Sequence, residues 1–120
     1  NGDGFKIIVS SYQDEQRKRF AIAQELGHLF LHMGYKTNAE IWEKQADKVP
    51  FQEKDPEKVR QANEFAAALL MPRYIFFLTL EAASDIAESG KRTIHMQAVA
   101  DFFNVSLSAA YTRAKDFGII

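Results

Sequence analysis

The sequence predicts a mainly helical α+β domain, with a short β element near its start and a helical hairpin at its end. Apolar residues recur at spacings of three and four along most of the chain, which is typical of helices. One early segment, residues 5–10, is instead short and rich in β-branched residues. The 120 residues are 47% hydrophobic and 26% charged, as in ordinary globular proteins. Because this length suits one domain, we expect residues 1–120 to fold as a single unit.

The first two predicted elements are a strand and a long helix. Residues 5–10 follow a glycine-rich start, and we interpret them as the strand. Residues 17–33 are predicted to be helical because their apolar side chains fall on one face. Gly34 stands where a helix stop belongs. The apolar positions of this helix are Phe20, Ala23, Leu26, Leu29, Phe30 and Met33.

Two capping signals predict the next two helices. Asn38 can cap a helix over residues 39–49. Asp55 and Pro56 form a cap and a first helical position, and the helix that they open extends to about residue 71. Both this helix and the earlier one over residues 17–33 carry apolar stripes. We therefore expect the two to pack against each other.

Pro72 either ends that helix or bends it into another, which we expect to continue to about Glu88. Gly90 ends this element. Thr93 then caps a helix that runs through Phe103. The predicted helical content of the second half of the chain is accordingly high.

The last part of the chain, residues 93–118, is predicted to be a hairpin that resembles a helix-turn-helix. Asn104 can adopt the left-handed conformation of a tight turn, and Ser106 can cap a final helix over residues 107–116. Charges from residue 93 onward sum to zero, whereas a DNA-reading face should be basic. We therefore favour a structural or protein-binding hairpin, and keep DNA binding as a weaker alternative.

Composition restricts the classes of function. The chain has no cysteine, which excludes disulfides and thiolate metal sites and favours a reducing, cytoplasmic setting. Its net charge of −1 gives no general attraction to nucleic acid or to anionic membranes. No stretch approaches the ~18 apolar residues of a membrane span, and no signal peptide is visible. Since the chain starts at an asparagine, we expect it to be a fragment that lacks some N-terminal structure.

The segment from Gln24 to His28, Gln-Glu-Leu-Gly-His, stands out chemically. With His in place of Gln24 it would read His-Glu-x-x-His, in which two imidazoles on one helix face hold zinc. The glutamate between them would accept a proton from the metal-bound water. Here one imidazole is missing. By itself a lone Glu-x-x-His is weak evidence, and a surface or structural role is the simpler interpretation.

Three blocks in order strengthen the signal. Residues 17–32 contain an Arg-Phe pair, an apolar stretch, Gln-Glu-Leu-Gly-His and then Leu-Phe-Leu-His. Residues 61–72 read Gln-Ala-Asn-Glu-Phe-Ala-Ala-Ala-Leu-Leu-Met-Pro, and residues 100–106 end in Phe-Asn-Val-Ser. Together these blocks resemble the active-site helix, the Ala-Asn-x-Phe-Ala-x-x-Leu-Leu-Met-Pro signature and the Phe-x-Val-Ser turn of the ImmA/IrrE metallopeptidase family. The resemblance covers roughly residues 5–118.

The resemblance implies a compact zincin-like core with a short sheet and the motif helix. It implies a zinc cofactor, with Glu25 as general base and positions 24 and 28, here Gln24 and His28, as metal ligands. Members of the family are often encoded by phages or mobile elements. Characterised members cleave or otherwise inactivate helix-turn-helix repressors, so such a repressor is the implied partner.

This sequence departs from the family at two of the three ligand positions. Gln24 replaces the first histidine, and Val59 stands where the third ligand, a glutamate, is usual. On a straight helix Glu57 and Glu64 lie about 200° and 140° from position 59, so a change of register would be needed for either to replace it. Catalytic zinc sites ordinarily use about three protein ligands. We therefore expect no tightly bound zinc, which leaves Glu25 without a water to activate.

His32 extends the same helix stripe as Gln24 and His28. A relocated metal site on the two histidines is one interpretation. The other, which we favour, is a structural hydrogen bond from His32, because buried polar groups need partners.

Two interpretations of function follow. The first is a metal-deficient pseudoenzyme that regulates a helix-turn-helix repressor by binding it. The alternative is an active zinc metallo-endopeptidase that cleaves such a repressor with an altered ligand set. Both place the protein in the cytoplasm, without membrane contact and without direct nucleic-acid binding.

Overall fold

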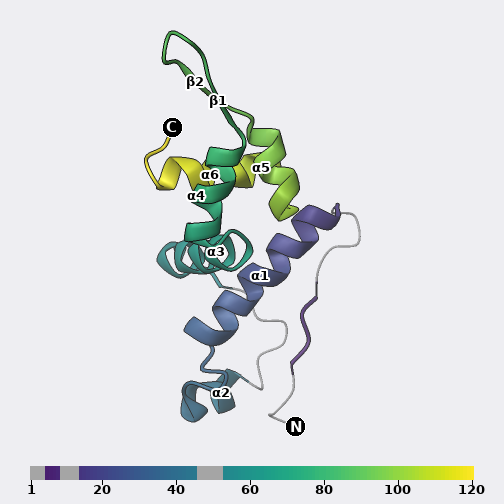
Figure 1. Ribbon diagram of the computed structural model, residues 1–120. Coiled ribbons are helices and arrows are strands. Elements are labelled where there is room, and N and C mark those ends of the chain that lie inside the picture. Colours follow the sequence, from purple (N-terminus) through teal and green to yellow (C-terminus); the bar gives the residue numbers. More distant parts are fainter. Residues whose placement is uncertain (1–4, 9–13, 46–52) are drawn as a thin grey trace.

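The protein is seen in a computed structural model that describes residues 5–8, 14–45 and 53–120. Six helices and two strands follow one another along the described chain (Figure 1). They are α1 (Glu15–Leu31), α2 (Ala39–Gln45), α3 (Pro56–Leu70), α4 (Arg73–Ala82), β1 (Ser84–Ile86), β2 (Arg92–Ile94), α5 (Met96–Phe103) and α6 (Leu107–Asp116). The mainly helical α+β class is thus confirmed.

The helix starts follow the capping residues. The side chain of Asp14 accepts from the backbone N–H of Arg17 at the start of α1. The side chain of Asp55 caps α3 by accepting from Glu57, and Pro56 occupies the first helical position. The helices predicted over residues 17–33 and 56–71 are confirmed with small shifts of their ends, and for the one over 39–49 only residues 39–45 lie within the described part.

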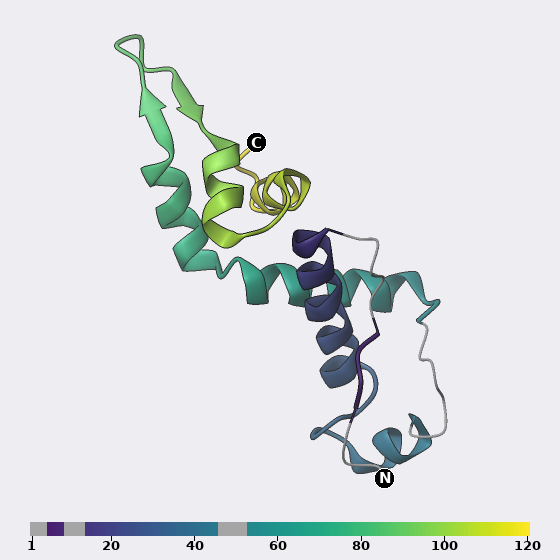
Figure 2. The same ribbon diagram turned by 90° about the vertical axis from the view of Figure 1, so that its right-hand side faces the viewer.

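The elongated molecule measures 62 × 29 × 22 Å along its principal axes. The β hairpin projects at one end and α2 lies at the other, with α1 crossing α3 between them (Figure 2). An apolar core joins α4, α5 and α6 near the hairpin end. Its buried members are Met71, Phe76, Leu80, Met96, Val99, Ala100, Phe103, Val105, Ala110 and Ala114.

The predicted strand over residues 5–10 is wrong for the part that the structure describes. Residues 5–8 form no strand, and residues 9 and 10 lie outside the described part. The Phe5 ring instead packs edge-on against Tyr35, with 5.1 Å between the ring centroids. A β-rich composition needs a partner strand to become a sheet, and the chain segment that does find one lies elsewhere.

The sheet is formed by residues that were predicted to be helical. The helix expected to reach Glu88 ends at Ala82, and Thr93, expected to cap a helix, pairs with Asp85 in the antiparallel β1–β2 hairpin. Gly90 has a φ of +86° at the turn, a conformation that glycine adopts without strain. The three-residue strands are too short for the alternating pattern to stand out against helical spacing.

The end of the chain matches its prediction. Asn104 adopts the left-handed conformation, with φ 53° and ψ 51°, and closes α5. The side chain of Ser106 caps α6 by accepting from Ala109. The α5–α6 hairpin therefore forms as expected, although α5 begins at Met96 and the residue at its N-cap is His95 rather than Thr93.

In the described part, no single helix is long and apolar enough to cross a membrane. The consecutive helices α3 and α4 would pass this test together, by length and composition only, but they are bent by 59°.

Candidate functional site

The site is built on the crossing of α1 and α3, which pack together as the sequence predicted. Gly27 of α1 lies at the crossing, where an added Cβ would be 3.1 Å from the Cα of Ala62 and from the Cβ of Phe65. Ala62 and Ala66 are fully buried. Small residues on both helices let the two backbones approach closely, so the motif of α1 faces the Ala-Asn segment of α3.

The Arg-Phe pair of the motif helix joins α1 to the rest of the molecule. Arg19 Nη1 donates to the carbonyl oxygens of Phe103 and Asn104, at 2.6 and 3.0 Å. These are the last residues of α5 and its turn, so one guanidinium ties the start of α1 to the α5–α6 hairpin. Phe20 lines a pocket on the adjoining side.

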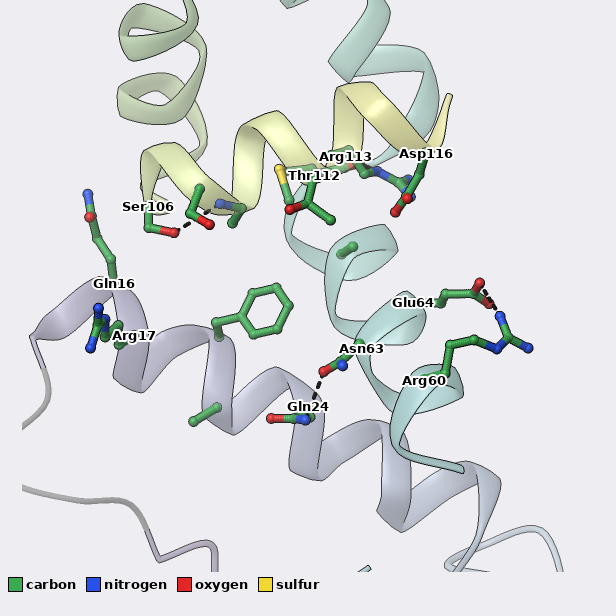
Figure 3. A pocket seen from close by; sticks show the side chains of 16 residues that line it. Gln16, Arg17, Gln24, Arg60, Asn63, Glu64, Ser106, Thr112, Arg113 and Asp116 are labelled. Atoms are coloured by element: carbon green, nitrogen blue, oxygen red, sulfur yellow. Dashed lines mark hydrogen bonds and ion pairs between the residues drawn. The ribbon is translucent and has the colours of Figure 1, made fainter. Parts of the chain in front are cut away.

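Gln24 is half-buried at the crossing, and its amide Nε2 donates to Asn63 Oδ1 at 2.8 Å (Figure 3). The two residues belong to two different motif blocks, one on α1 and one on α3. The hydrogen bond holds the Gln24 amide toward α3. A histidine at this position would present an imidazole, but the amide serves as a helix-to-helix link.

His28 is buried, with only 3% of its surface exposed. Its Nδ1 lies 2.9 Å from His32 Nδ1, and His32 Nε2 lies 2.8 Å from Gln61 Oε1. Because the Gln61 oxygen accepts, His32 donates through Nε2 and accepts from His28 through Nδ1. Burial, with the neighbouring His32 as a smaller cause, lowers the pKa of His28. The structural hydrogen bond expected of His32 is therefore present.

Glu25 is half-buried, and burial raises the pKa of its carboxyl above the ordinary value. A general base at neutral pH gains from such a shift. Glu25 is not among the described residues that line the pocket beside Gln24.

The carboxylates near the third ligand position are engaged elsewhere. Arg60 pairs with both Glu57 and Glu64 on the exposed side of α3. Hydrogen bonding from Arg60 lowers the pKa of Glu57. Val59 itself is half-buried and offers no ligand atom.

A pocket of about 620 Å³ opens between α1, α3 and α6 (Figure 3). Its apolar lining comes from all three helices and includes Phe20, Ala67, Met71 and Ala109. Polar and charged side chains surround this lining, and both signs of charge are present. The labelled polar residues in Figure 3 are Gln16, Arg17, Gln24, Arg60, Asn63, Glu64, Ser106, Thr112, Arg113 and Asp116.

Arg113, one of the two cations of the C-terminal hairpin, is used for packing. Its Nε donates to the carbonyl oxygen of Met71 at 3.1 Å, and its guanidinium lies 4.4 Å from the centre of the Phe117 ring. Burial lowers the pKa of Arg113. This contact ties α6 to the end of α3 and directs the guanidinium along the pocket wall rather than outward from the hairpin.

The residues at the family's zinc position do not fit a zinc ion. The Gln24 amide is neutral and hydrogen-bonded, and Val59 is apolar, so His28 alone would remain of the three. The structure brings a different residue to the histidines. One ligand atom each of His28, His32 and Glu53 lies within 4.8 Å of the others. Sequence reasoning missed Glu53, because it lies in the segment before α3, 25 residues from His28, with no helical spacing to connect them.

Comparison with known proteins identifies the family of the chain. A sequence model of the IrrE N-terminal-like domain, a peptidase M78 family, matches residues 5–115. A search of curated proteins and a search of solved structures each found no match. The family match spans both helices of the crossing and nearly all of the C-terminal hairpin, and so contains Gln24, Glu25, His28, His32 and Glu53.

Proposed function

Because the chain belongs to the IrrE N-terminal-like domain family, we propose that it is a zinc-peptidase-fold protein that lacks metal at the family's catalytic position. It regulates a helix-turn-helix repressor by binding the repressor without cutting it. The observation that carries the proposal is the hydrogen bond from Gln24 to Asn63 at 2.8 Å. The first ligand position is thereby built into the α1–α3 contact instead of facing a metal.

The pocket beside this hydrogen bond supports binding of a protein segment. Its apolar lining, which includes Phe20 and Met71, can take up an apolar side chain, while the surrounding polar groups fix orientation. Ser108 and Thr112 place the exposed side of α6 along the same pocket. A helix or loop of a repressor would bury apolar surface here, and binding would depend on this burial rather than on chemistry.

The DNA-binding alternative receives less support. Arg113 is engaged with Met71 and Phe117, which leaves Lys115 as the other cation of the final helix. A face that binds phosphates needs several accessible cations. We therefore assign the α5–α6 hairpin a structural role and a share of the protein-binding pocket.

The test compares two tryptophan substitutions on α6. Ser108→Trp fills the pocket, whereas Lys115→Trp adds the same ring to an exposed position that is not among the pocket residues. Candidate repressors from the source genome are screened by fluorescence anisotropy and by a reporter for repressor release. Binding lost in Ser108→Trp and kept in Lys115→Trp is the expected result. Equal binding by both variants would place the contact elsewhere.

A second experiment separates binding from cleavage. Glu25→Gln should leave repressor release unchanged, because no metal-bound water depends on this carboxyl. In a zinc peptidase, loss of the general base should lower the rate about 10²–10⁴-fold. Release is measured in cells, beside a gel that detects repressor fragments. Fragments that disappear in Glu25→Gln together with release would establish the peptidase alternative.

A further inference from the structure

Besides His28, which also belongs to the family's ligand set, two residues outside that set, His32 and Glu53, have metal-binding side chains close together. We propose that His28, His32 and Glu53 form a binding site for one divalent transition-metal ion of the zinc type, displaced along α1 from the family's zinc position. One ligand atom from each residue lies within 4.8 Å of the other two. This inference does not depend on the proposed repressor binding. It concerns the C-terminal end of α1, whereas Gln24 and the pocket lie nearer its start.

The donor set suits zinc. Two imidazoles and one carboxylate are a ligand set that binds zinc in proteins with a fourth position left for water. The His28 and His32 Nδ1 atoms are 2.9 Å apart. Two nitrogens on a tetrahedral zinc, each at about 2.0–2.1 Å from it, are roughly 3.4 Å apart. The rings must therefore separate by only about half an ångström to exchange their shared proton for a metal ion.

The groups around the three ligands are those that a metal site requires. His32 Nε2 donates to Gln61 Oε1 at 2.8 Å, which fixes the ring so that Nδ1 is its lone-pair atom. The Glu53 carboxylate accepts from the backbone N–H of Asp55 at 3.0 Å, and this bond restrains the side chain. His28 is buried, which restricts the movement of its ring. Metal-binding histidines ordinarily have such outer partners.

A metal ion here would connect two elements. His28 lies in the last turn of α1, His32 is its C-cap residue, and Glu53 lies two residues before the cap of α3. The ion would anchor the segment that enters α3 to α1. Its effect is therefore structural, and it stabilises the α1–α3 crossing on which the site is built.

The test uses the full chain, freed of metal by chelation and titrated with Zn²⁺ or Co²⁺ alone. We expect one ion per chain and, with Co²⁺, visible absorption of a four- or five-coordinate site. His32→Ala and Glu53→Gln should each remove most of the affinity, and Gln61→Ala, an outer partner, should weaken binding about 10–100-fold. Glu53 lies outside the helices, so Glu53→Gln is expected to leave the fold intact, which circular dichroism verifies.

Two matched controls locate the site. Gln24→Ala removes the side chain at the family position and should leave metal affinity unchanged. His95→Ala removes a histidine on the other side of the molecule, where it bonds to Asp85, and should also leave it unchanged. Absence of binding in the unmodified chain would overturn the proposal. So would affinity that survives Glu53→Gln and His32→Ala, or that is lost in Gln24→Ala, because the ion would then sit elsewhere.

Discussion

At the scale of single residues, position 24 shows how one side chain changes the use of a retained motif. Gln24 keeps the helical position of a zinc ligand but directs its amide to Asn63 of α3. His28 hydrogen-bonds His32, which in turn hydrogen-bonds Gln61 of α3. The helix face that would carry the zinc ligands thus contributes contacts between α1 and α3. Glu25 remains on this helix, with a pKa raised by burial, next to a ligand position that holds Gln24 instead of a histidine.

Restoring the family's ligand set is the residue-scale prediction. Gln24→His with Val59→Glu should rebuild a His/His/Glu set with His28 and raise zinc affinity at least tenfold, whereas Gln24→His alone should help little. Affinity is measured by zinc titration against a competing chelator. The titration is done in the Glu53→Gln background, since both sites would share His28. An equal gain from Gln24→His alone would contradict the role assigned to Val59.

The motif residues could be identified from sequence because they follow helical spacing. Gln24, Glu25 and His28 lie on one helix, where the i, i+4 rule fixes their relative placement. Glu53 could not be found in this way, because only the fold of the segment before α3 brings it to His28. The hydrogen bond from Gln24 to Asn63 likewise joins two blocks whose contact depends on how α1 and α3 cross.

At the scale of elements, the α1–α3 crossing is the feature that positions the site. Gly27 permits it, since an added Cβ would lie 3.1 Å from Ala62 Cα and 3.2 Å from the Ala62 carbonyl oxygen. These contacts are with backbone atoms, which cannot rotate away as a side chain can. The crossing could be predicted because both helices carry apolar stripes and α3 contributes small residues. The β1–β2 hairpin could not, because its short strands resemble helix in their spacing.

Enlarging Gly27 tests the crossing. Gly27→Leu should lower the free energy of unfolding by about 1–3 kcal/mol, because a larger side chain at a packed position forces the helices apart. Lys115→Leu, which introduces the same side chain at an exposed helical position of α6, is the control and should change stability little. Chemical denaturation followed by circular dichroism provides the measurement. Equal stability of the two variants would contradict the close α1–α3 approach.

The ion pairs on the exposed side of α3 make a pH-dependent contribution to the stability of the folded state. Arg60 lowers the pKa of Glu57 below its ordinary value of 4.5, so the folded state favours the ionised carboxylate. This stabilisation of the folded state is complete above pH 4.5 and is lost as the pH falls through the lowered pKa. Arg60→Gln should therefore lower the thermal midpoint at neutral pH but not in strong acid. Lys91→Gln, an exposed cation on the hairpin, should show no such pH-dependent difference. A difference that persists in acid would show that Arg60 acts through packing.

At the scale of the whole molecule, the protein is elongated, whereas the family resemblance implied a compact core. The radius of gyration is 17.5 Å, against about 14 Å for a compact domain of this length. Sequence could not predict this shape, because it follows from the 59° bend between α3 and α4 and from the distance between the main core and α2. Local spacing determines helices, but their arrangement depends on contacts between residues far apart in the chain.

Arg19 is the residue through which this shape can be tested, because its guanidinium joins the start of α1 to the end of α5. Small-angle scattering of the unmodified monomer should give a radius of gyration near 17.5 Å.

Arg19→Ala should increase this radius and lower the thermal midpoint, since the carbonyl oxygens of Phe103 and Asn104 lose a charged donor, a bond worth about 1.5–3 kcal/mol. Arg17→Ala is the matched control, because Arg17 lies about half a turn from Arg19 but pairs with Asp14 at the helix start, and this change should leave the radius unchanged. Light scattering verifies that each sample is monomeric. A radius near 14 Å for the unmodified monomer would contradict the extended arrangement, and an unchanged radius in Arg19→Ala would show that other contacts hold α1 against the α5–α6 hairpin.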